Sequence, residues 1–142
     1  MIAVLGTGQS AGNGLISCGL AWVGQGTNGN LYSSMSSRMY SITAIDCGAT
    51  TFVHELGHNQ GLAHSRKQGD TSGGVYVDGM GHGVQNEFAS IMAYPHVYGS
   101  ATQYDYFSNP NWSVNGIAFG ITNQAYAIRT VTATKTSIAN FK

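Results

Sequence analysis

The amino-acid sequence predicts one domain of the α+β class, with a strand-rich upper part, one helix packed on it, and an irregular lower part that ends in a second helix. Three observations support this class. Short apolar runs with strand-forming side chains occupy the first 46 residues, a helical pattern follows from residue 50, and glycine and aromatic residues then dominate until a second helical pattern near residue 122. We therefore expect residues 1–61 to form the upper sheet and first helix, and residues 62–142 to form the lower subdomain.

Three strands are expected in the upper part. Residues 2–5 (IAVL), 18–24 (CGLAWVG) and 38–46 (RMYSITAID) have strand patterns, and a loop of Gly, Asn and Ser lies between the last two. If those two strands pair as an antiparallel hairpin, Cys18 at the start of one lies opposite Cys47 just beyond the end of the other, which would suit a disulfide. Two buried thiols are the alternative, although a composition rich in Ser, Thr, Asn and Gly favours the disulfide.

Two helices are expected in the remaining chain. The first begins at Thr50 or Thr51, either of which is a plausible N-cap, and ends at Asn59 or Gly61. The second begins near Thr122 or Asn123 and runs toward the C-terminus. Between them we expect a loop at 65–83, a short apolar run at 87–94 that stops before Pro95, and an irregular aromatic stretch.

Composition excludes several classes of partner. Charged residues make up only 8% of the 142 residues, against about 25% in a typical soluble domain, and the formal net charge is zero. A basic stripe for phosphate backbones is therefore lacking, and no apolar run approaches the roughly 18 residues of a membrane helix. We expect neither nucleic acid nor a membrane as a partner. Glycines interrupt the opening segment 1–18, which indicates part of the folded domain rather than a secretory signal.

The chemistry of the chain is concentrated in residues 54–64, HELGHNQGLAH. On a helix, His54 and His58 lie one turn apart on the same face and can bind one metal ion. Glu55 lies beside the first histidine, where a carboxylate can act as general base and then general acid on a water activated by zinc. This combination of groups hydrolyses amides.

A catalytic zinc needs three protein ligands and an open position. His64 would lie too far along the axis if the helix simply continued. Gly61 can adopt a positive φ, end the helix and turn the chain back, so that His64 becomes the third ligand.

These residues fit the pattern HExxHxxGxxH, and the chain therefore resembles the metzincin zinc endopeptidases. Residues 90–94, SIMAY, resemble the methionine turn of that family, which implies that Met92 lies beneath the zinc. The bacterial reprolysin-like and peptidyl-Asp metallopeptidases are the most similar group. Their pattern is matched by CGLAWVG, by Cys47 before the histidine motif, by FASIMAY and by YFSNPNWSVNGIAFG, which together cover nearly the whole chain.

The resemblance implies a metzincin-type fold with an active-site cleft between the upper and lower parts. It implies that CGLAWVG is an exposed edge strand along which an extended peptide substrate binds. It also implies that Tyr94 can reach the zinc or the reacting oxyanion. The strand, helix and strand that usually come before the element matched by IAVL are not found in this sequence.

A preference for aspartate in the substrate is not expected. No Lys or Arg occurs between Lys67 and Arg129 to supply a cation, although His82 or His96 could contribute one. Five aromatic residues instead predict an apolar or aromatic pocket: Tyr94, Tyr98, Tyr104, Tyr106 and Phe107. We expect His82 to be a loop residue and His96 to lie on the cleft wall or the surface.

The leading interpretation is a secreted, bacterial, monomeric zinc metalloendopeptidase. It would bind Zn²⁺ through His54, His58 and His64, use Glu55 as general base and acid, and contain a Cys18–Cys47 disulfide. One alternative is a catalytically weak or inactive peptide-binding or adhesion module of the same fold, stabilised by zinc. Another is a cytosolic metal-binding protein, which free cysteines would favour.

Overall fold

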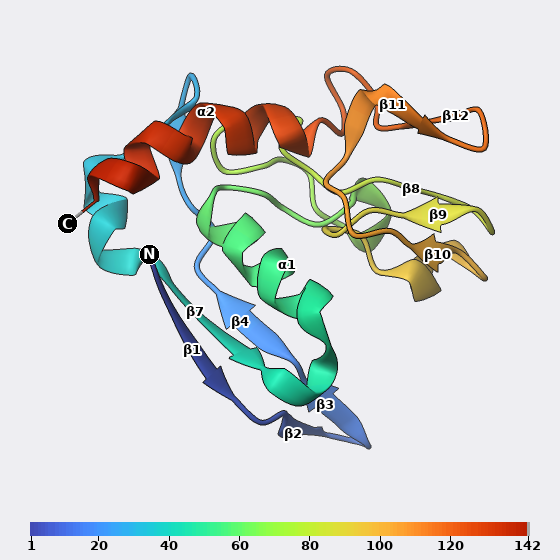
Figure 1. Cartoon of the computed structure of the whole chain (residues 1–142), viewed down its shortest axis with the longest axis horizontal. Helices are drawn as coiled ribbons and strands as arrows, with labels where there is room; N and C mark the ends of the chain where they lie inside the picture. The colour runs from blue at the N-terminus through green and yellow to red at the C-terminus, as the bar shows by residue number, and fades with distance from the viewer. Residues whose placement is uncertain (142) are drawn as a thin grey trace.

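The computed structural model describes residues 1–141 and confirms a mixed α+β domain (Figure 1). Its two α-helices are α1 (Ala49–Asn59) and α2 (Ala127–Asn140). The strands before α1 are β1 (Ile2–Gly6), β2 (Gln9–Gly12), β3 (Leu15–Ser17), β4 (Gly19–Ala21), β5 (Gly26–Thr27), β6 (Asn30–Leu31) and β7 (Tyr40–Ala44). Those between α1 and α2 are β8 (Gly83–Val84), β9 (Phe88–Ala89), β10 (Thr102–Gln103), β11 (Asn109–Val114) and β12 (Ile117–Phe119). Short 3-10 helices are Ser33–Arg38, Ile45–Cys47, Arg66–Gln68 and Pro95–Tyr98.

The three predicted strands form one sheet in the order β1-β7-β4. β1 is parallel to β7, and β4 is antiparallel to β7 with Leu20 opposite Ile42. β4 is therefore an edge strand, as predicted, but it is shorter than 18–24. The chain leaves the sheet after Ala21 and reaches the end of α1, where the Gly24 N–H donates to the His58 carbonyl at 2.8 Å.

The two faces of this sheet differ in burial. Ser41 and Thr43 of β7 are buried on the face that α1 covers, whereas Tyr40 and Ile42 are exposed on the other face. Apolar side chains of β1 and β4 are exposed as well, namely Ile2, Val4 and Leu20, and so is Trp22 just after β4. In Figure 1, α1 lies along one side of the β1-β7-β4 sheet.

Three Asn-Gly pairs make hairpins where no strand pairing was expected. Asn13–Gly14 joins β2 to β3, Asn28–Gly29 joins β5 to β6, and Asn115–Gly116 joins β11 to β12. Each Asn has φ between 49 and 51°, and each Gly between 76 and 84°. Positive φ at both central residues is the requirement of the two-residue hairpin turn, and Asn-Gly satisfies it at little cost.

Both predicted helices are present, but each begins at a different residue from the one expected. α1 begins at Ala49 after Gly48, so neither Thr50 nor Thr51 is its N-cap. Their hydroxyls donate elsewhere, to the Asp105 carboxylate at 2.6 Å and to the Cys47 carbonyl at 3.2 Å respectively.

α2 begins at Ala127 rather than near Thr122 or Asn123. Residues 121–125 form a turn closed by a bridge between Ile121 and Ala125, with Asn123 at φ 63°. The helix then starts where the Ser108 hydroxyl can accept the Ala127 N–H at 2.9 Å. Because Ser108 is 19 residues away, local sequence did not indicate this start.

The predicted disulfide between Cys18 and Cys47 is confirmed, with a Cα–Cα distance of 5.6 Å. Cys47 lies in the short 3-10 helix between β7 and α1, not in the strand. The bridge therefore ties the residue before edge strand β4 to the residues that lead into α1.

The lower part is irregular, as expected, and contains small apolar clusters. Phe88, Val114 and Phe119 form one of them, between the β8-β9-β10 sheet and the β11-β12 hairpin. α2 crosses from the lower part to the upper part, where Ile138 packs on a cluster of Leu31, Met35, Met39 and Val75. Within residues 1–141, no helix is both long enough and apolar enough to span a bilayer.

Candidate metal centre and cleft

Helix α1 presents His54 and His58 from successive turns, and both side chains are buried. Each ring is held through Nδ1. That of His54 lies 2.8 Å from the Ile91 carbonyl oxygen, and that of His58 lies 2.8 Å from the Leu62 carbonyl oxygen. A carbonyl oxygen only accepts, so both Nδ1 atoms carry the proton and both Nε2 atoms are bare in the neutral rings.

Gly61 ends α1 in the way the sequence predicts. Its φ is 89°, and the Leu62 N–H donates to the Gly57 carbonyl while the Gly61 N–H donates to the His58 carbonyl. This pair of bonds is the Schellman motif. The chain then reverses, and Ala63 forms a parallel bridge with Met80 that fixes the segment leading to His64.

Asp70 fixes the third histidine. Its Oδ2 accepts the His64 backbone N–H at 2.7 Å and lies 3.2 Å from His64 Nδ1. As with the other two rings, an acceptor at Nδ1 leaves Nε2 bare. Asp70 lies in the glycine-rich stretch and belongs to no motif, so the sequence alone does not indicate its role.

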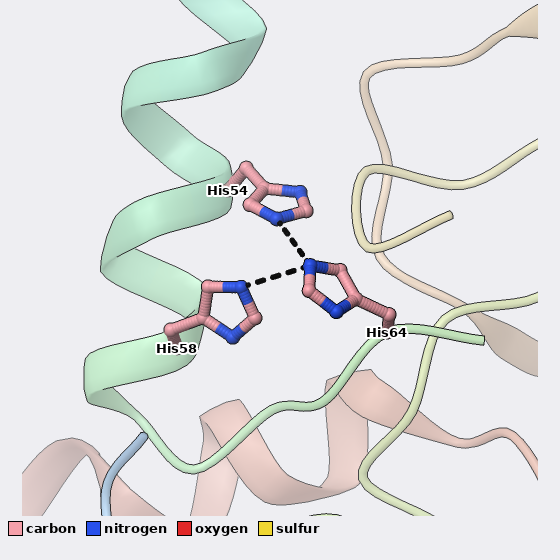
Figure 2. A group of neighbouring side chains, drawn as sticks. All are labelled: His54, His58 and His64. Carbon is pink, nitrogen blue, oxygen red and sulfur yellow. Dashed lines mark hydrogen bonds between the residues drawn. The ribbon is translucent and has the colours of Figure 1, made fainter. Parts of the chain in front are cut away.

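The three bare nitrogens point at one another (Figure 2). His64 Nε2 lies 3.2 Å from Nε2 of His54 and 3.2 Å from Nε2 of His58, and no proton is available to bridge them in the neutral rings. Three converging lone pairs repel unless a cation lies among them, so this arrangement fits a metal ion. Of the His, Cys, Asp and Glu side chains in residues 1–141, this trio is the one group placed to bind a metal, with ligand atoms within 4.8 Å of one another.

The protonation of the trio also suits a metal. Burial, and to a smaller extent the neighbouring His58, lower the pKa of His54 to about 4 against the raising effect of the Ile91 hydrogen bond. Burial likewise lowers the pKa values of His58 and His64. The rings are therefore neutral near pH 7, the form that binds metals.

Glu55 is buried between α1 and edge strand β4. A β-carbon on Gly19 would lie 2.2 Å from Glu55 Oε1, so the carboxylate rests against the bare backbone of Gly19. Burial raises the Glu55 pKa to about 7. Near neutral pH this carboxyl can both accept and donate a proton, which suits a general base that later acts as an acid. Gly19 was not singled out by the sequence analysis.

Met92 and Tyr94 lie in and just after a turn next to the trio. The turn is closed by the Ala93 N–H donating to the Ser90 carbonyl, and Met92 is fully buried with its sulfur beside Gly57 of α1. The Tyr94 hydroxyl lies 3.3 Å from His64 Nε2 and can donate to it. Both residues thus contact the elements that hold the histidines.

A cleft of about 950 Å³ opens beside the trio. One wall of the cleft is lined by Ile16 to Gly19, and the back is lined by four residues of α1: Thr50, Thr51, His54 and Glu55. The other wall is formed by Tyr94, Pro95, His96, Gln103 and Asp105. His96 is thus on the cleft wall, as expected. His82 lies away from the trio and packs edge-on against Phe88.

The predicted aromatic pocket is found in part, beside the cleft rather than in it, since Tyr106 and Phe107 line a smaller pocket with Ile91 and Trp112. Tyr94 lines the cleft, but Tyr104 packs against Phe119 and Tyr106 against Trp112. Tyr98 is buried with Ala89 and Ala93, and Phe107 packs on the Leu62, Ile91 and Met92 cluster. Tyr98 and Tyr104 therefore serve the lower core, and the cleft wall contains the polar groups of His96, Gln103 and Asp105.

Comparison with known proteins identifies relatives along the whole chain. A model of the family described as Metallo-peptidase family M12 matches residues 1–108. A peptidyl-Asp metalloendopeptidase of Pseudomonas aeruginosa is 35% identical over 156 aligned residues, which cover 100% of this chain and 26% of the relative. Proteins of the same name from Stenotrophomonas maltophilia and Xanthomonas campestris pv. campestris are 37% and 33% identical over 77% and 81% of this chain, and 27% and 29% of their own lengths.

The chain thus spans about a quarter of the length of these curated relatives. No solved structure matches it significantly. The similarity to metallopeptidases that the histidine motif predicts is confirmed. Since the family model covers most of the chain and one relative aligns with all of it, the chain belongs to the metallo-peptidase family M12.

Proposed function

We propose that this chain is the catalytic domain of a secreted zinc metalloendopeptidase. The observation that carries the proposal is the convergence of three bare imidazole nitrogens beside a buried carboxyl in an open cleft. Three neutral imidazoles suit zinc, and three protein ligands with access to a cleft are typical of a catalytic rather than a structural zinc site.

In this proposal His54, His58 and His64 hold the ion. Zinc, when bound, supplies a Lewis acid that polarises a carbonyl group and makes water acidic near neutral pH. Glu55 takes the proton of the attacking water and later gives it to the leaving amine. The pKa of about 7 that burial gives this carboxyl supports both transfers.

The substrate lies as an extended peptide along β4. The Ala44 N–H donates to the Cys18 carbonyl, so Cys18 directs its backbone groups toward β7. Successive residues of an antiparallel strand direct their backbone groups to opposite sides, and the N–H and C=O groups of Gly19 and Ala21 therefore point away from β7. These free groups are the ones that an added peptide strand would pair with. Gly19 also lines the cleft, next to Glu55.

Met92 and Tyr94 have supporting roles. Met92 packs beneath α1 and maintains the position of the helix that carries two ligands. Tyr94 donates its hydroxyl proton in a hydrogen bond to the oxyanion that develops at the scissile carbonyl. Its position 3.3 Å from His64 Nε2 supports this role.

The proposal extends to the location and state of the protein. The disulfide favours an oxidising compartment over the cytosol, so it argues against a cytosolic metal-binding protein. We propose that the protein is bacterial, exported and monomeric, and that its substrates are peptides or proteins, in line with the names of the relatives.

The proposal is tested by measuring zinc content and gelatin cleavage for the native chain and Glu55→Gln. The substitution removes the proton acceptor but no zinc ligand, so we expect bound zinc in both proteins and cleavage by the native chain alone. Stoichiometric zinc with no cleavage by either protein would contradict the proposal and favour a zinc-stabilised peptide-binding module. Equal cleavage by both would indicate a contaminating protease.

A further inference from the structure

The cleft contains a carboxylate that the proposed chemistry does not use. Asp105 is exposed on the wall opposite β4, and its Oδ1 accepts the Thr50 hydroxyl at 2.6 Å. Among the described residues it has no ion-pair partner, since the salt bridges found there are His64–Asp70 and Arg129–Asp78. Its negative charge is therefore not neutralised by a protein cation, and it borders the space where a substrate would lie.

Apart from the proposed zinc ion, no cation lies in the cleft to balance this charge. The lining residues of the described chain include no Lys or Arg, and the ionisable groups that accompany Asp105 are Glu55, the metal-binding His54, and His96 on the wall. A carboxylate at such a site attracts a cationic side chain and repels an anionic one. A peptide that places a cationic side chain at contact distance should bind roughly tenfold or more tightly than one that places an anionic side chain there. This difference in affinity falls as salt is added.

We propose that Asp105 makes the cleft select peptides with a lysine or arginine side chain and reject those with aspartate or glutamate. The inference rests on the proposed function, because it names the class of substrate for that same site. The proposed preference of this chain for Lys or Arg differs from the preference for aspartate implied by the names of its relatives, which are called peptidyl-Asp metalloendopeptidases.

The Thr50 contact gives Asp105 a fixed place near the first turn of α1, where a carboxylate can also stabilise the helix. Asp105→Asn separates the two roles. The amide oxygen can still accept the Thr50 hydroxyl, so the fold and the helix start are retained while the charge is removed. Glu87→Gln is the matched control, because Glu87 is an exposed carboxylate that does not line the cleft.

The test measures binding without turnover, in zinc-loaded protein that carries Glu55→Gln. Fluorescence anisotropy is recorded with alanine-based octapeptides in which one Lys, Gln or Asp is moved through the central positions. At low salt we expect the best Lys peptide to bind at least about tenfold more tightly than the corresponding Asp peptide. Asp105→Asn, introduced in addition to Glu55→Gln, should reduce this affinity ratio severalfold, and so should 0.5 M salt. Glu87→Gln in the same background should leave the ratio unchanged.

Three results would overturn the inference. The first is a Lys-to-Asp affinity ratio at or below one, and the second is no detectable binding of any peptide. The third is a ratio that Asp105→Asn leaves unchanged. Gelatin cleavage by the native chain is scored separately. Cleavage without a Lys preference rejects only the proposed role of Asp105. A Lys preference without cleavage rejects only the proposed peptidase activity.

Discussion

At the scale of single residues, the candidate metal centre depends on groups that orient ligands without being ligands. Each histidine has its Nδ1 beside an acceptor: the Ile91 carbonyl, the Leu62 carbonyl or the Asp70 carboxylate. Two of these acceptors are backbone atoms that a substitution cannot easily remove. Asp70 is the one that mutagenesis can reach.

We expect Asp70→Ala to weaken zinc binding by about 10- to 100-fold, since outer-sphere partners of ligating histidines commonly contribute that much. The substitution removes the acceptor for both the His64 ring and its backbone N–H. The measurement is a competition titration with a chromophoric chelator, with circular dichroism as a check on folding. Asp70→Asn retains one acceptor oxygen and should have an intermediate affinity. Unchanged affinity in the alanine variant would contradict the role of Asp70.

Gly19 is the second residue whose importance comes from contact rather than from chemistry. A β-carbon there would lie 2.2 Å from Glu55 Oε1, so Gly19→Ala should displace the carboxylate while leaving the three histidines in place. We expect at least a tenfold loss of gelatin cleavage with zinc affinity retained. Gly6→Ala is the control, because a β-carbon on Gly6 meets nothing within 4 Å. Full activity of Gly19→Ala would refute the close packing of Glu55 on β4.

At the scale of elements, the end of α1 decides whether His64 reaches His54 and His58. The Schellman motif at Gly61 needs a positive φ, and a β-carbon there would also lie 2.6 Å from Val75 Cγ2. Gly61→Ala should therefore destabilise the metal-free protein by about 1 to 3 kcal/mol and weaken zinc binding as well. Urea denaturation and chelator competition measure the two effects.

Gly116→Ala separates the strain of a positive φ from the delivery of His64. Gly116 has φ 78°, lies in the β11-β12 turn, and has open space around its α-carbon. We expect this variant to lose stability but to keep the zinc affinity of the native chain. If both glycine variants bound zinc equally well, the turn at Gly61 would not be what brings His64 to the other ligands.

The elements also show which parts of the fold local sequence could predict. The β1, β4 and β7 strands, helix α1 and the turn at Gly61 followed from alternation, helical spacing and glycine chemistry. The three Asn-Gly hairpins carried an equally local signal that was overlooked. The start of α2 had no such signal, because it is set by Ser108. Asp70 lies six residues after His64 but belongs to no motif, and Asp105 reaches the cleft through the packing of a segment 55 residues from Thr50.

At the scale of the whole molecule, the disulfide is a covalent link between the residue before edge strand β4 and the segment that leads into α1. Cys18 and Cys47 are 29 residues apart, and closing a loop of that size in the unfolded chain stabilises the folded state by about 3 to 4 kcal/mol. We expect the double variant Cys18→Ser, Cys47→Ser to lose a stability of this order in urea denaturation without reductant. Native protein treated with reductant should match it. An unchanged denaturation midpoint in both would contradict a stabilising role.

The Nδ1 contacts of the three histidine rings have a consequence for the thermodynamics of metal uptake. Rings already locked by a carbonyl or carboxylate have few rotamers left to lose, so the ordering of side chains has in large part occurred during folding. A site of this kind binds as a preorganised chelate. Calorimetric titration with zinc should then show a small heat-capacity change, and amide exchange along α1 should be nearly the same before and after the ion enters.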